Sequence, residues 1–123
     1  MLCEAPVFIL AEYFGSTTND AGSGIFHMNS SKCAFAIEVV QMPKTTGTGY
    51  CKFRDADGDT VNFRASSKGI LGRSTDANFT ITNGTGKYKG ITGTGLFKAN
   101  NVPSFEQGTF QALGTFGGSY KLP

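Results

Sequence analysis

The sequence predicts an all-β protein, and three observations lead to this class. The 123 residues include 17 glycines and 11 phenylalanines, with many threonines, which favours strands broken by turns. Short runs of alternating apolar and polar residues recur along the chain, as in half-buried strands. No window of about a dozen residues sustains the 3.6-residue period of a helix. A chain of this length is expected to form one domain, residues 1–123, around a single core.

The expected strands follow one another with turn residues between them. Residues 7–15 are apolar at nearly every position except Glu12, which is typical of a strand packed on both faces. A longer strand at residues 33–41 ends before Pro43, because proline cannot donate to a ladder. The other expected strands are residues 24–28, 49–54, 60–65, 77–82, 95–99, a segment with Phe110 and Ala112, and residues 118–122.

The clearest local prediction is a β-hairpin turning at Asp57-Gly58, between the strands at 49–54 and 60–65. Their alternation places apolar residues on one face and mostly polar residues on the other: Cys51, Phe53, Val61, Phe63 and Ala65 against Tyr50, Lys52, Arg54, Asn62 and Arg64. About eight short strands joined in this way close most economically as a single antiparallel eight-stranded β-barrel, since closure removes exposed edges. A two-sheet β-sandwich is the alternative.

Charge and motif patterns exclude several classes of partner. The net charge is only +2 and the 11 basic residues are scattered, whereas nucleic-acid binding needs a concentrated basic surface. No apolar stretch approaches the roughly 20 residues that a membrane helix requires. The glycine-rich stretch at residues 82–95 matches neither a P-loop nor a dinucleotide fingerprint, so it is interpreted as a strand connector, and no cofactor is expected.

The order of four motifs resembles a group of small, largely uncharacterised bacterial proteins with an allene-oxide-cyclase-like, lipocalin-like β-barrel. These motifs lie at residues 49–53, 55–59, 83–93 and 118–123, so the resemblance covers roughly the last two-thirds of the chain. It implies an eight-stranded antiparallel barrel, commonly exported, without an established reaction. The group often carries a cysteine in a Gln-Gly-Cys stretch before the last strand, where this chain has Gln111-Ala112-Leu113.

The cysteines are interpreted in the light of this resemblance. Cys33 and Cys51 match two cysteine positions of the group and lie on neighbouring expected strands, which makes them candidates for a cross-strand disulfide in an exported protein. The alternative is two reduced, buried thiols that behave as small apolar residues. Cys3 is a third, separate thiol. The sequence does not fix the compartment, and export to the periplasm or medium would require a signal peptide upstream.

Two kinds of acidic residue are candidates for chemistry. The aspartates of residues 55–59 imitate the start of a calcium loop, but Thr60 and Ser66 stand where the glycine and glutamate of such a loop belong, so no metal site is predicted. Glu12 and Glu38 each interrupt an apolar strand face. Inside a barrel, either carboxyl group would have a raised pKa and could donate a proton or orient a ligand. The alternative is that they point outward.

Three functions remain open at this stage. The first is a binding module that holds one small apolar ligand in the barrel interior. The second is a cyclase or isomerase without a cofactor, in which the cavity folds the substrate and Glu12 or Glu38 assists. The third is a structural protein with a filled interior that forms a homo-oligomer. The candidate lining residues of the first are Phe53, Phe63, Phe79, Phe97 and Phe110.

Overall fold

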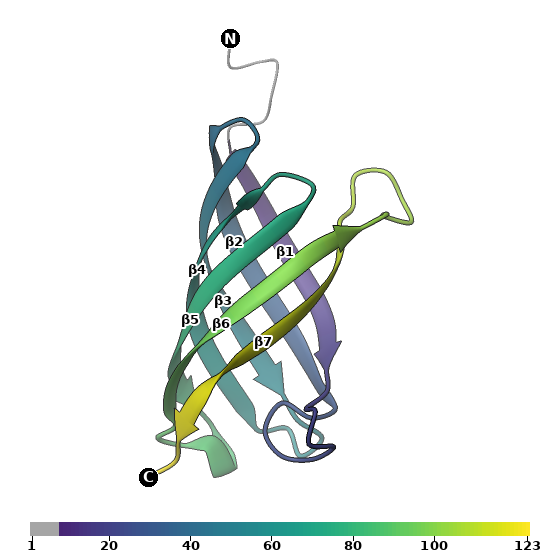
Figure 1. The fold of residues 1–123 in the computed structure, drawn as a ribbon. Helices are drawn as coiled ribbons and strands as arrows, with labels where there is room; N and C mark the ends of the chain where they lie inside the picture. The colour runs from purple at the N-terminus through teal and green to yellow at the C-terminus, as the bar shows by residue number, and fades with distance from the viewer. Residues whose placement is uncertain (1–7) are drawn as a thin grey trace.

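The computed structural model describes residues 8–123, which form one antiparallel sheet that curls into an open half-barrel (Figure 1). The sheet has seven strands in sequence order, each paired with the next. They are β1 (Phe8–Thr17), β2 (Asn29–Gln41), β3 (Lys44–Arg54), β4 (Thr60–Ile70), β5 (Ser74–Gly84), β6 (Thr92–Val102) and β7 (Gln111–Lys121). A single 3₁₀ turn, η2 (Gly86–Tyr88), connects β5 to β6. Within residues 8–123 there is no helix long and apolar enough to cross a bilayer.

The all-β, antiparallel prediction is therefore confirmed, while the strand count and the closure differ from the expectation. The described residues form seven strands in one sheet, and β1 and β7 are its two unpaired edges, with no Cα atoms within 8 Å of each other. The two strands expected near the C-terminus are one continuous strand, β7. Cys3 and Val7, the first residue of the strand expected at residues 7–15, lie outside the described residues.

The expected strand at residues 24–28 is wrong, because this segment is a folded loop. Phe26 and Met28 have φ angles of 63° and 53°, which no strand permits, and Gly24 also has a positive φ. The Asn19 side-chain amide donates to the carbonyl of Ile25 (2.9 Å), and the Thr17 hydroxyl donates to the carbonyl of Phe26 (2.6 Å). These bonds hold the loop across one end of the half-barrel, with the Phe26 ring turned inward.

The predicted hairpin between β3 and β4 is confirmed. The backbone N–H of Asp55 donates to the carbonyl of Asp59 (3.0 Å), and Gly58 takes the positive φ of 86° that this turn requires. The apolar face predicted for the two strands is buried: Cys51, Phe53, Val61, Phe63 and Ala65. The half-barrel therefore has a concave, apolar inner face and a largely polar outer face.

Phenylalanine rings lie over glycines on neighbouring strands of the inner face. Phe35 of β2 faces Gly49 of β3, and Phe79 of β5 faces Gly95 of β6, each as a directly opposed pair. A Cβ atom built on either glycine would overlap the facing ring. A ring that covers a strand glycine compensates for the missing side chain. This pairing accounts for the glycines at these two strand positions.

Candidate functional site

The inner face is aromatic at the end of the half-barrel that holds the β3–β4 turn and η2. Phe53, Phe63 and Phe79 form a run of stacked rings, with centroids 5.1 Å and 4.9 Å apart. Phe26 from the loop packs edge-on against Phe53 (4.9 Å) and against Phe116 of β7 (5.2 Å). Edge-on and tilted contacts at these distances are favourable aromatic geometries. This end of the interior is therefore filled by side chains.

The inner face carries short side chains at the opposite end, near the β2–β3 and β4–β5 connections. We call this part of the inner face the short-chain end. Gly47, Ser67 and Ala77 are directly opposed across β3, β4 and β5, and the row continues to Phe97 of β6. Ile37 of β2 pairs with Gly47 on the other side of the row. Ile37, Ser67 and Phe97 are only half-buried. Here the side chains of the concave face are small, and apolar Ile37 and Phe97 flank them while staying partly exposed to solvent.

The five phenylalanines that the sequence proposed as lining residues have three different positions. Phe53, Phe63 and Phe79 belong to the packed aromatic cluster and are buried. Phe97 borders the short-chain end. Phe110 lies in the β6–β7 connection, one residue before β7 begins, and its side chain is 51% exposed. The structure therefore does not bring Phe110 to the concave face.

Glu12 and Glu38 both point outward, so the expectation of a carboxyl group inside the barrel is wrong. Both side chains are exposed on the outer face, and Glu12 lies 4.0 Å from the ammonium of Lys32. In the strand register, Glu12 is opposite Ala34, whereas the neighbouring residue Tyr13 is opposite Cys33 of the inner face. The apolar residues that share the face of Glu12 are themselves exposed: Phe8, Leu10 and Phe14.

Cys33 and Cys51 are joined by a disulfide across the inner face. They are directly opposed on β2 and β3, with their Cα atoms 4.1 Å apart. This separation suits the closer of the two pair types in an antiparallel ladder. Cys51 is buried beside Phe53 and Phe63. The bond ties the two strands together where the aromatic cluster begins.

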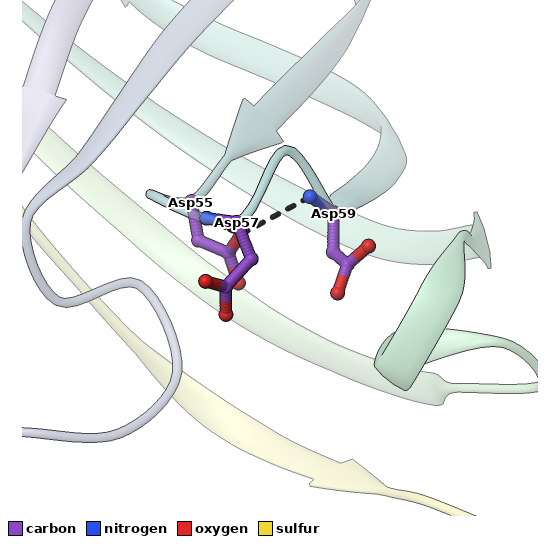
Figure 2. A group of neighbouring side chains, drawn as sticks. All are labelled: Asp55, Asp57 and Asp59. Atoms are coloured by element: carbon purple, nitrogen blue, oxygen red, sulfur yellow. Dashed lines mark hydrogen bonds between the residues drawn. The ribbon is translucent and has the colours of Figure 1, made fainter.

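The three aspartates of the β3–β4 turn gather around one point at the aromatic end (Figure 2). Each offers a carboxylate oxygen within 4.8 Å of the others. The Asp55 carboxylate accepts the backbone N–H groups of Asp57 (2.9 Å) and Asp59 (3.1 Å), which shapes the turn. The same carboxylate accepts the phenolic O–H of Tyr88 in η2 (3.0 Å).

The ammonium of Lys87 in η2 lies against two of these three carboxylates. Its Nζ atom lies 2.7 Å from Asp55 and 2.7 Å from Asp57. The hydrogen bond from Lys87 is the main cause that lowers the pKa of Asp55 to about 2, and the hydrogen bond from Tyr88 adds to it. In turn, Asp55 and Asp57 raise the pKa of Lys87. These interactions join the β3–β4 turn to the β5–β6 connection. We call the group of Asp55, Asp57, Lys87 and Tyr88 the clasp.

Sequence reasoning missed Lys87 and Tyr88 as partners of this clasp. The only signal was a basic, glycine-rich stretch that looked like a connector. Gly86 has a φ of 57°, and a Cβ atom at this position would overlap the Asp59 carboxylate. Glycine here lets η2 approach the acidic turn closely.

A depression of about 790 Å³ lies on the outer face and crosses β2 to β6. One row of side chains along it is in register across the strands and alternates in charge: Glu38, Thr46, Lys68, Asp76 and Lys98. The side chains of this row are polar and mostly exposed, whereas other residues that line the depression are apolar, among them Phe8, Ala36 and Leu96.

The fold and these positions define an all-β protein with a curled seven-stranded sheet and an apolar concave face. No protein-family model, curated protein or solved structure matches the chain. What the protein does must therefore be inferred from its own residues.

Proposed function

We propose that the protein is a binding module that holds a small apolar molecule at the short-chain end of its concave face. This proposal rests on the difference in side-chain size between the two ends of the inner face. Rings fill the aromatic end, whereas Gly47, Ser67 and Ala77 leave the other end with little side-chain volume. Half-buried Ile37 and Phe97 supply apolar walls there. Small-molecule sites are concave and mostly apolar, as this end is.

We further propose that the site works within an eight-stranded closed barrel, the architecture that the sequence resemblance implies. An eighth strand between β7 and β1 would convert the open trough into an enclosed interior. Barrels of eight strands are just wide enough for side chains or one small ligand. The cyclase alternative is less favoured, because Glu12 and Glu38 are on the outer face and cannot supply an interior acid.

The chain offers a matched pair of variants for the test, because Ser66 and Ser67 are neighbours with opposite orientations. Ser67 faces inward beside Gly47, while Ser66 is exposed on the outer face. Ser67→Leu should fill the room at the short-chain end, and Ser66→Leu adds the same atoms outside. Titration with the fluorescent probe anilinonaphthalene sulfonate, whose aromatic rings bind apolar surfaces, should show binding about tenfold weaker for Ser67→Leu, or about 1.4 kcal/mol.

Native mass spectrometry of freshly purified protein complements the titration. A discrete added mass that is lost on denaturation would identify a ligand carried through purification. Thermal melting of both variants shows whether each is folded before binding is compared. Equal probe affinity for folded Ser67→Leu and Ser66→Leu would contradict the proposed site.

A further inference from the structure

The two free edges of the sheet run in the same direction. Every neighbouring pair of strands is antiparallel, and the number of strands is odd, so β1 and β7 are parallel to each other. Figure 1 shows both arrowheads pointing toward the end of the sheet that holds the C-terminus. Joining β1 directly to β7 would place one parallel pair in an otherwise antiparallel barrel. One additional strand running the opposite way would be antiparallel to both edges.

The two edges are too far apart to pair directly with each other. No Cα atom of β1 lies within 8 Å of any Cα atom of β7. Neighbouring strands are about 4.8 Å apart, so a strand inserted between two others separates them by about 9.6 Å. We call the space between β1 and β7 the edge slot.

Neither edge carries the features that usually prevent strands from pairing. β1 and β7 have 10 and 11 residues, contain no proline, and hold one charged residue each, Glu12 and Lys121. Their ladders with β2 and β6 run without a bulge. Natural edge strands are protected by charges, prolines, bulges or short length. Within residues 8–123, every strand already has its place in the sheet, so none is left to cover these edges.

Large apolar side chains flank the edge slot on the outer face as well as the inner one. Leu10 and Phe14 of β1 are 77% and 74% exposed, and Leu113 of β7 is 77% exposed. On the inner face, the slot lies beside Tyr13 of β1 and Phe116 of β7. A strand in the slot would therefore meet apolar neighbours on both of its faces, which favours an uncharged, apolar strand.

We propose that the edge slot binds one extended segment of another polypeptide, about ten uncharged and mostly apolar residues long, antiparallel to both β1 and β7. Recognition follows the strand-addition mode, in which backbone hydrogen bonds give affinity and flanking side chains give selectivity. This inference rests on the eight-stranded closure proposed above and names the source, direction and character of the eighth strand.

The test uses a synthetic peptide of about ten valine, isoleucine and threonine residues with a lysine at each end. Hydrogen–deuterium exchange of the whole protein should slow in both β1 and β7 when the peptide is added. A spin label at the N-terminus of the peptide should broaden amide signals near Thr17 and Lys121, because the antiparallel strand begins at that end. A peptide with N-methylated backbone amides should give no protection, since it cannot donate to the edges.

Three exposed leucines provide the matched variants. Leu10→Ser and Leu113→Ser remove apolar neighbours of the edge slot, and each should weaken peptide binding by about two- to fivefold. Leu96→Ser makes the same change on the outer face of β6, where Leu96 is 56% exposed and away from the slot, and should leave binding unchanged.

Several results would overturn the proposal. These are protection of only one edge, broadening at the Phe8 end of β1, no protection at all, or edges that already exchange slowly in the free protein. Ser67→Leu separates this inference from the proposed ligand site, since that variant should weaken probe binding about tenfold and keep peptide binding.

Discussion

Substituting alanine for Gly95 tests whether the phenylalanine–glycine pairs determine how the sheet packs. A Cβ atom at Gly95 would overlap the Phe79 ring and the carbonyl oxygen of Gly117. Extra atoms in a packed interior cost about 1–3 kcal/mol, so Gly95→Ala should destabilise the protein by that amount. For 123 residues, the entropy of unfolding is about 0.26 kcal/mol/K, so Tm should fall by about 4–12 °C.

Gly117→Ala is the matched control, because a Cβ atom at Gly117 would have no atom within 4 Å. Replacing a strand glycine that has open space should be neutral or stabilise by up to about 1 kcal/mol. Urea unfolding at constant pH measures both variants. Adding Phe79→Leu to Gly95→Ala should recover part of the loss, as expected for two residues in contact. Gly95→Ala and Gly117→Ala variants of equal stability would refute the packing argument.

Two further predictions concern the clasp and the disulfide. Because the pKa of Asp55 is lowered to about 2 in the folded protein, the stability it contributes should be present above about pH 4 and lost as the pH falls toward 2. Lys87→Met should reduce the loss of unfolding free energy that acid causes. Lys89→Met removes the same charge nearby and should leave that loss unchanged. If the unfolding free energies of the two variants depend on pH in the same way, the clasp is contradicted. The Cys33–Cys51 bond closes a loop with a sequence separation of 18, so adding reductant should lower the free energy of unfolding by about 3 kcal/mol. The Cys33→Ala/Cys51→Ala double variant should be insensitive to reductant, and a wild-type protein that is equally insensitive would contradict the bond.

Alternation identified the hairpin of β3 and β4 because one face of these strands is apolar and the other polar. The same rule could not orient β1, whose large apolar residues occupy both faces. Glu12 therefore looked like an interior acid although the register turns it outward with Leu10. A period of two gives the two faces of a strand but does not say which one is inside.

Long-range contacts account for what the sequence did not predict. Lys87 meets Asp57 across 30 residues of chain, so no local motif marks the clasp. Residues 24–28 are mostly apolar and were expected to form a short strand, but the segment bends so that Phe26 can reach Phe53 and Phe116. Here the burial of the Phe26 ring against other parts of the fold determines the backbone conformation of the segment.

The most direct test of the proposed function is a map of amide chemical shifts during titration with an apolar probe. The structure predicts the largest changes at Gly47, Ser67 and Ala77, which line the short-chain end of the concave face. Changes confined to Ser66 and Asn78, their outward-facing neighbours, would contradict an interior site.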